Sequence, residues 1–137
     1  MRQDCSFFCP IRVRYAEVDQ QGIVYNGNYL TYTDVAFAEF MRHKGWPYKK
    51  LVTETGFEVC HLKSTFTFKS SAFEDDMLEV GVRVLHIGTK SFTMGFEVYV
   101  EGRDELLVDV ECVFSGYDSK NRISRPLSDL MRSLLET

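Results

Sequence analysis

A carboxylate, two glycines and a predicted helix start lie close together in the first quarter of the chain. Asp19 is followed by Gly22 and Gly27, and Asn28 opens a segment with helical periodicity. A helix N-terminus presents unpaired N–H groups and about half a positive charge, so it can stabilise an oxyanion. A nearby carboxylate can attack a carbonyl carbon, or deprotonate the water that attacks it. Acyl transfer needs both functions, and the stretch from Asp19 to Tyr29 therefore predicts an acyl-transfer site.

The same residues also have a purely structural explanation. An Asp in a loop before a helix often caps that helix or forms a solvated turn. The residues of the loop alone leave this alternative open.

The elements that must position this loop follow from two periodicities. Ile11–Tyr15 alternates apolar and basic residues, as a half-buried strand does. From Asn28 an apolar stripe of helical spacing continues to Met41, with Asn28 as the expected N-cap and Gly45 at the C′ position. This pattern predicts a helix of about 16 residues, buried on most of its sides. After Phe57 only strand-like alternation is found, in four runs at 62–69, 78–85, 92–101 and 106–114.

A last apolar face after Pro126 predicts a short C-terminal helix, with Pro126 at its first position. The predicted order is strand, long helix, four strands and short helix, and short links between strands require antiparallel neighbours. We therefore expect an α+β fold, with a five-stranded antiparallel sheet packed on the long helix, in a single domain over residues 1–137. One helix covers only one face of the sheet, so free edges indicate a homo-oligomer.

Composition excludes several classes of protein. Sixteen Lys and Arg against 20 Asp and Glu give a net charge of −4, which argues against a nucleic-acid partner. The chain shows no signal-like start and no apolar run of the roughly 20 residues that a membrane span needs. The four cysteines form no Cys-x-x-Cys pair and have no His at metal-ligand spacing, so we expect reduced thiols, no metal and a cytoplasmic location.

The loop and its flanks resemble the signature of the 4-hydroxybenzoyl-CoA thioesterase family, small acyl-CoA thioesterases with the hot-dog fold. The signature residues are Arg12-Val13, then Asp19-Gln20-Gln21-Gly22-Ile23-Val24, then Tyr29. Two secondary matches are Ala72–Leu78, an aromatic and acidic turn into a strand, and Lys90-Ser91-Phe92 at the start of the next strand. The resemblance covers nearly the whole chain.

This resemblance implies an acyl-CoA thioesterase that releases a carboxylic acid and free CoA, with no cofactor other than the CoA of its substrate. It implies a sheet wrapped around the long helix, and a homodimer or homotetramer with sites at the subunit interface. Asp19 matches the catalytic Asp, acting as nucleophile or general base, and the backbone N–H of Asn26 matches the group that polarises the thioester carbonyl. Val18 and Asn26 depart from the residues usual at their positions (Thr or Cys, and His or an aromatic), which leaves the acyl group open.

We expect the substrate to be bound by residues of the loop and by one hairpin farther along the chain. These candidate binding residues are Gly22, Tyr25, Gly27, Asn28, Lys90 and Ser91. The resemblance assigns Lys90 and Ser91 to the phosphates of CoA, and Tyr25 is a separate candidate for lining the acyl pocket. The alternatives are solvated hairpin residues for the first two and core packing for Tyr25.

Two other functions fit the same scaffold. A binding module would hold acyl-CoA without turnover, as the departure at Asn26 suggests. A hydratase or dehydratase of the hot-dog type would need a His working with an acid, and no His lies between Asp19 and Tyr29.

Overall fold

The computed structural model describes all 137 residues. Three α-helices, six β-strands and two short 3-10 turns make up the regular structure. In chain order they are η1 (Arg2–Asp4), β1 (Phe7–Arg12), η2 (Tyr15–Glu17), α1 (Asn28–His43), α2 (Tyr48–Thr55), β2 (Glu58–Phe68), β3 (Met77–Ile87), β4 (Ser91–Val100), β5 (Val108–Asp118), β6 (Ile123–Ser124) and α3 (Asp129–Glu136).

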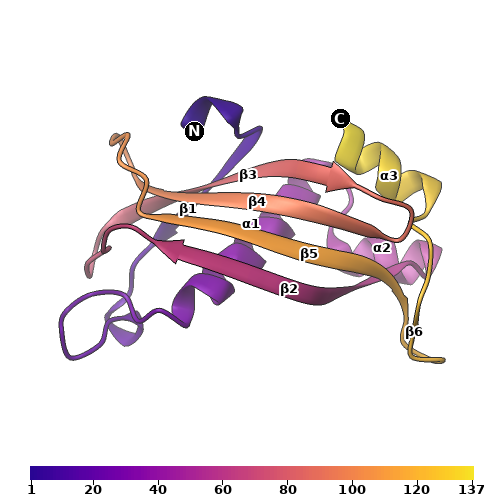
Figure 1. Ribbon diagram of the computed structural model, residues 1–137, viewed down its shortest axis with the longest axis horizontal. Coiled ribbons are helices and arrows are strands. Elements are labelled where there is room, and N and C mark those ends of the chain that lie inside the picture. The colour runs from indigo at the N-terminus through magenta and orange to yellow at the C-terminus, as the bar shows by residue number, and fades with distance from the viewer.

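The strands form one curved antiparallel sheet in the order β1-β3-β4-β5-β2, with the two-residue β6 added beside β5. Helix α1 crosses behind this sheet, while α2 and α3 lie toward one end of it (Figure 1). The predicted α+β fold, a sheet around one long helix with a short C-terminal helix, is confirmed. Both β1 and β2 pair on one side only, so β2 leaves an 11-residue edge without a partner in this chain.

Strand β4 shows how the strict alternation of the sequence builds the core. Phe92, Met94, Phe96 and Val98 are fully buried in the hydrophobic cluster that α1 joins. Their neighbours Glu97 and Tyr99 point to the outward face, because successive side chains of a strand point to opposite faces.

The long helix has the predicted length, but its ends and its burial differ from the prediction in detail. Gly27 is the N-cap, and Asn28 is instead the first helical residue. Gly45 has φ +86° and accommodates the left-handed turn predicted for the C′ position. The helix is buried along one face only, and Leu30 and Val35 remain more than two-fifths exposed on the other.

The predicted first strand, Ile11–Tyr15, is displaced by several residues from the observed β1. Pro10 lies within β1, where it is tolerated because β1 is an edge strand and needs no second set of N–H donors. After Val13 the chain turns away from the sheet, and the Glu17 N–H bonds back to the carbonyl of Arg14 in a 3-10 turn. The alternation of apolar and basic residues therefore continues beyond the strand itself.

Two elements were missed and one was predicted too early. Helix α2 has Pro47 as its N-cap and Gly56, at φ +73°, as its C-cap, which are signals that the sequence contained. The short β6 is held by the turn that follows β5. Helix α3 begins after Pro126, at Asp129, because the Ser128 side chain accepts the N–H of Met131 and sets the N-cap there.

Candidate active site

The loop that carries Asp19 folds back on itself before it enters α1. The N–H of Asp19 bonds to the carbonyl of Ile23 at 2.9 Å, and the N–H of Tyr25 bonds to the carbonyl of Glu17 at 2.9 Å. Gly22 turns the chain between these two arms with φ +78°, a value that side chains other than glycine rarely adopt. The loop thus has a defined conformation next to the helix N-terminus.

The Asp19 carboxylate is half-buried and only partly satisfied. Its Oδ1 accepts the N–H of Gln21 at 2.8 Å, while Oδ2 has no hydrogen-bond partner in the chain. No Lys, Arg or His forms an ion pair with it. One carboxylate oxygen is therefore free to act on a substrate or a water.

The helix entrance offers unpaired donors in the same loop. Neither the N–H of Asn26 nor that of Gly27 bonds to any group of the chain, and no side chain caps the helix at Gly27. The next two N–H groups, of Asn28 and Tyr29, bond to the carbonyls of Tyr25 and Asn26. Free donors at a helix N-terminus are what an oxyanion requires.

Two tyrosine side chains near this helix entrance are exposed to solvent. Tyr25 is 59% exposed and its ring lies against Gly27, where an added Cβ would meet Tyr25 Cε2 at 2.9 Å. Core packing, the alternative for Tyr25, is therefore wrong, and Tyr15 is also exposed, at 79%. Asn28 does not cap the helix, and its Nδ2 donates to the carbonyl of Glu17 at 2.8 Å.

Sequence reasoning missed a buried carboxylate in this loop. Glu17 accepts the main-chain and guanidinium N–H groups of Arg14 and the hydroxyl of Tyr32. Burial alone raises the pKa of Glu17, but the hydrogen bonds from Arg14 and Tyr32 outweigh it and hold the pKa below its ordinary value. The spacing Arg14-x-x-Glu17 was the available signal, since it suits an ion pair across one turn.

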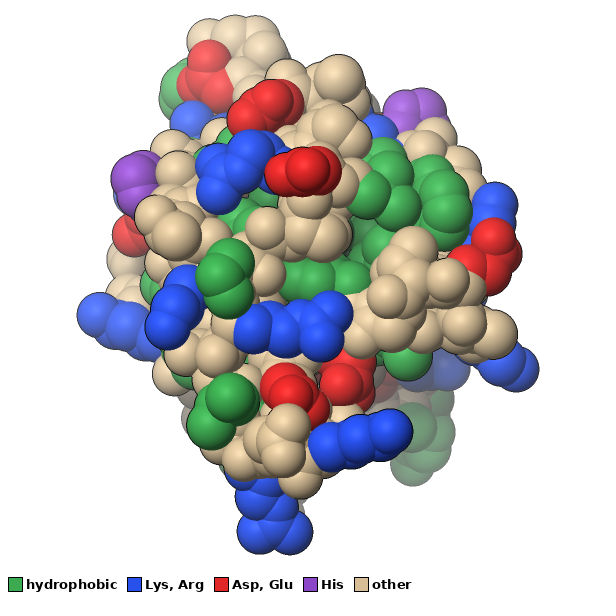
Figure 2. Space-filling model, turned by 90° about the vertical axis from the view of Figure 1, so that its right-hand side faces the viewer, with side chains coloured by type: hydrophobic (Ala, Val, Ile, Leu, Met, Phe, Trp, Pro, Cys, Tyr) green, Lys and Arg blue, Asp and Glu red, His purple; other side chains and the backbone are tan.

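Lys90 and Ser91 lie at the opposite end of the sheet from Asp19. They belong to the hairpin between β3 and β4, beside α3, whereas the Asp19 loop adjoins the other end of β3 (Figure 1). Eleven residues of strand span roughly 35 Å, so one chain does not bring the two groups together. Figure 2 looks onto the hairpin end, where Lys and Arg side chains are interspersed with acidic ones and form no uniform cationic patch.

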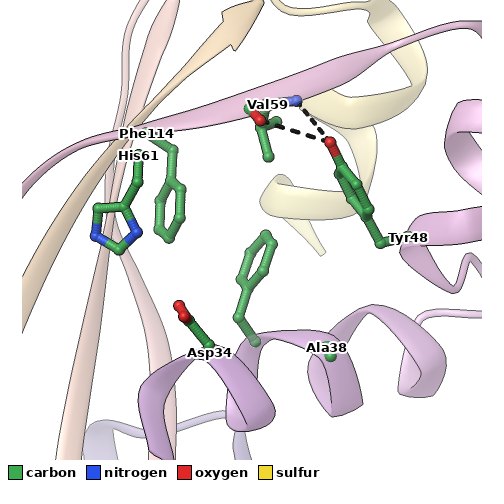
Figure 3. A pocket seen from close by; sticks show the side chains of 7 residues that line it. Asp34, Ala38, Tyr48, Val59, His61 and Phe114 are labelled. Atoms are coloured by element: carbon green, nitrogen blue, oxygen red, sulfur yellow. Dashed lines mark hydrogen bonds between the residues drawn. The ribbon is translucent and has the colours of Figure 1, made fainter. Parts of the chain in front are cut away.

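A cavity of about 340 Å³ opens between the middle of α1, the start of α2 and the strands β2 and β5. Its lining residues are Asp34, Phe37, Ala38, Tyr48, Val59, His61 and Phe114. The rings of Phe37 and Phe114 stack with centroids 5.0 Å apart, so the cavity has an aromatic wall. Tyr48 closes one side, because its hydroxyl accepts the N–H of Val59 at 3.1 Å (Figure 3).

An acid and an imidazole face this aromatic cavity, Asp34 from α1 and His61 from β2 (Figure 3). Burial raises the pKa of Asp34, and the nearby His61 partly counters that rise. A bulge in β2 after His61 puts His61 and Ser64 on one face, where His61 Nε2 hydrogen-bonds to Ser64 Oγ. Asp34 and His61 lie 27 positions apart in the chain, so no local pattern in the sequence indicates that they line one cavity.

The remaining expectations concern thiols, metals and membranes. All four cysteines are free thiols. No group of three or more His, Cys, Asp or Glu side chains is arranged to hold a metal ion. None of the helices combines the length and the apolar character that crossing a bilayer requires.

Comparison with known proteins relates this chain to a family. The model of the Thioesterase-like superfamily matches residues 13–135. A protein of Aquifex aeolicus is 38% identical over 90 residues, which cover 66% of this chain and 70% of that protein. The acyl-CoA thioester hydrolase YbgC of Escherichia coli is 32% identical over 78 residues, 57% of this chain and 58% of YbgC.

A solved structure shows the same architecture. A mutant 4-hydroxybenzoyl-CoA thioesterase bound to 4-hydroxybenzoyl-CoA superposes with a TM-score of 0.84, over 94% of this chain and 97% of the other, at 20% identity. At that identity the likeness speaks for the fold alone. The family match over nearly the whole chain goes further: this chain belongs to the Thioesterase-like superfamily and, as a hot-dog member of it, is a thioester hydrolase with acyl-CoA thioesterase activity at the level of the family.

Proposed function

We propose that this protein hydrolyses acyl-CoA thioesters at the loop between Asp19 and Asn28, without a metal or cofactor. The observation that carries the proposal is the pair of unpaired N–H groups of Asn26 and Gly27, in the same loop as a carboxylate with one free oxygen. A thioester carbonyl oxygen bound to these donors gains negative charge as its carbon is attacked, and the donors then stabilise it.

The chemistry has two forms that the residues support. In the first, Asp19 removes a proton from water, the water oxygen bonds to the thioester carbon, the C–S bond breaks, and the CoA sulfur leaves and takes up the proton. In the second, an oxygen of Asp19 bonds to the carbon, CoA leaves, and water hydrolyses the resulting anhydride. Label in Asp19 after a single turnover in isotopically labelled water would demonstrate the second form, with water attacking the Asp19 carbonyl carbon of the anhydride; attack at the acyl carbonyl labels the product, as the first form does.

The test of the reaction is an acyl-CoA panel with thiol detection. Asp19→Asn keeps an oxygen for the Gln21 N–H and removes only the charge, so we expect kcat to fall by roughly 10²- to 10⁴-fold. Asp109→Asn, a change at a half-buried acid on β5, is the matched control and should keep the wild-type rate. Equal rates for wild type and Asp19→Asn would contradict the assignment, and tight acyl-CoA binding without thiol release would favour the binding module.

We further propose that two copies pair through the free edge of β2, so that each site uses both. The Phe68 end of β2 adjoins the Asp19 end of the molecule, where the rings of Tyr29 and Phe68 lie 5.8 Å apart, and the Glu58 end adjoins the hairpin with Lys90. Antiparallel pairing about a two-fold axis brings opposite ends of the two sheets together. Lys90 and Ser91 of one protomer then serve the Asp19 loop of its partner.

Mixing two inactive variants tests this shared site. A heterodimer of Asp19→Ala and Lys90→Ala chains would hold both changes in one site and leave the other intact. Random exchange should therefore restore about a quarter of the wild-type activity per site at low substrate concentration. Mixing without any recovery would show that each chain acts alone.

A second candidate function has one observation in its favour. His61 and Asp34 face the same aromatic cavity, and a His working with an acid is what a hot-dog hydratase would need. Formation of a 3-hydroxyacyl-CoA from an enoyl-CoA, identified by mass spectrometry and abolished in His61→Ala, would support this activity. Absence of any 3-hydroxyacyl product from protein that hydrolyses acyl-CoA would reject it.

A further inference from the structure

Glu17 is a buried carboxylate for which the reaction proposed above has no use. Only 6% of the residue is exposed, although its neighbour Ala16 lies at the surface. A carboxylate in such a place needs hydrogen bonds that replace its hydration. Oε1 accepts the N–H of Arg14 and the hydroxyl of Tyr32, each at 2.9 Å, and Oε2 accepts the Arg14 guanidinium. The side chain thereby joins the loop to the second turn of α1.

The main-chain oxygen of Glu17 makes a second set of contacts. It accepts the N–H of Tyr25 at 2.9 Å and the Nδ2 of Asn28 at 2.8 Å. These donors lie on either side of Asn26 and Gly27, whose own N–H groups are free. One carbonyl therefore holds both flanks of the candidate oxyanion donors.

We propose that Glu17 is a positioning residue that sets the placement of the Asp19 carboxylate relative to the free N–H groups of Asn26 and Gly27. The inference rests on the proposed function. Glu17 is two residues before Asp19 on the same arm of the loop, and its bond to Tyr32 ties that arm to the helix that carries the donors. Loss of this hydrogen bond lets the Asp19 carboxylate and the N–H groups of Asn26 and Gly27 move apart, while the buried face of α1 stays packed.

Tyr32→Phe is the mildest change that removes the hydrogen bond between Tyr32 and Glu17, since it deletes one hydroxyl and leaves the ring and the Arg14 contacts in place. The matched control is Tyr99→Phe. The Tyr99 hydroxyl donates to Glu97, another nearly fully buried carboxylate, on the outward face of β4. Both variants lose the same atom from the same kind of contact, but only Tyr32 connects to the loop.

We expect kcat to fall by roughly tenfold to a hundredfold in Tyr32→Phe with KM changed less than about twofold, because misplacement by about an ångström affects the transition state more than binding. Tyr99→Phe should keep the wild-type kcat even where its melting temperature falls equally. The amide resonances of Asn26 and Gly27 should shift in Tyr32→Phe and stay in place in Tyr99→Phe. The substrate is the acyl-CoA that wild type hydrolyses fastest among acetyl-, hexanoyl-, palmitoyl- and benzoyl-CoA.

Two results would overturn the inference while leaving the proposed function intact. One is an unchanged kcat in Tyr32→Phe, and the other is an equal loss of kcat in both variants, which would show that activity simply follows stability. A wild type that hydrolyses none of the four thioesters refutes the proposed function itself, and the positioning role with it. Glu17→Gln, which puts an amide in place of the acceptor that faces Arg14, should reproduce the effect of Tyr32→Phe and exceed it.

Discussion

Replacing Gly116 by alanine probes the corner of the molecule that holds the hairpin with Lys90. A Cβ at Gly116 would lie 2.4 Å from the carbonyl oxygen of Arg125 and 3.2 Å from that of Pro126. Both neighbours are main chain and cannot rotate away as a side chain can. To reach an ordinary contact the segment around Arg125 must retreat by nearly 1 Å, which breaks its N–H bond to the Gly116 carbonyl, now 2.9 Å long.

The cost of this change follows from two contributions. Overpacking of a close contact costs about 1–3 kcal/mol, and the lost hydrogen bond adds about 1 kcal/mol. At about 2.1 cal/mol/K per residue, 137 residues have an unfolding entropy of about 290 cal/mol/K, so each kcal/mol lowers the melting temperature by about 3.5 °C. We expect Gly116→Ala to melt roughly 7–14 °C below wild type.

Gly95→Ala is the matched control, since Gly95 is also a buried glycine within a strand. Its Cβ would meet only side-chain atoms, of Leu85 at 3.1 Å and of Arg83 at 3.3 Å, and these flexible side chains are 37% and 33% exposed. Scanning calorimetry of the two variants should show that Gly95→Ala lowers the melting temperature by no more than about 3 °C. If both variants lose the same stability, or Gly116→Ala loses none, the reasoning from main-chain contact is refuted.

Two further predictions use the shifted pKa values. Because Arg14 and Tyr32 lower the pKa of Glu17 below its ordinary 4.5, the stability it contributes is complete above pH 4.5 and is lost as the pH falls through the lower folded value. Urea unfolding should therefore show a difference in the free energy of unfolding between wild type and Glu17→Gln that is constant from about pH 8 to 5 and becomes smaller in stronger acid. A difference that grows in acid would contradict this. Burial, aided by the charge of Glu97, raises the pKa of the Cys5 thiol to about 11, so at pH 8 about one molecule in a thousand carries the reactive thiolate. Mass spectrometry after brief treatment with iodoacetamide should find Cys5 unmodified at pH 8 and modified about tenfold faster at pH 9, whereas a rate at pH 8 equal to that of a free thiol would refute the shift.

Most of the fold could be predicted because the spacing of apolar residues along short segments indicates each helix and strand. The stripe from Tyr29 to Met41 repeats at helical spacing, and strands such as β4 alternate strictly, so each reports the face that a core must cover. The boundaries failed where tertiary contacts decide them: Val13 continues the alternation of β1, yet the 3-10 turn that follows takes the chain off the sheet.

The candidate site likewise has features that the sequence predicts and features that depend on tertiary contacts. Asp19 and the helix entrance are neighbours in sequence, so their juxtaposition, and the resemblance of their motif to a thioesterase family, were available from the sequence by itself. Only the tertiary structure showed that Glu17 is buried, that Asp34 and His61 share a cavity, and that Lys90 lies at the far end of β3 from Asp19. The physical reason is that burial and distance across a sheet depend on strand order and register, which join residues far apart along the chain, whereas periodicity and motifs record only what lies within a few turns.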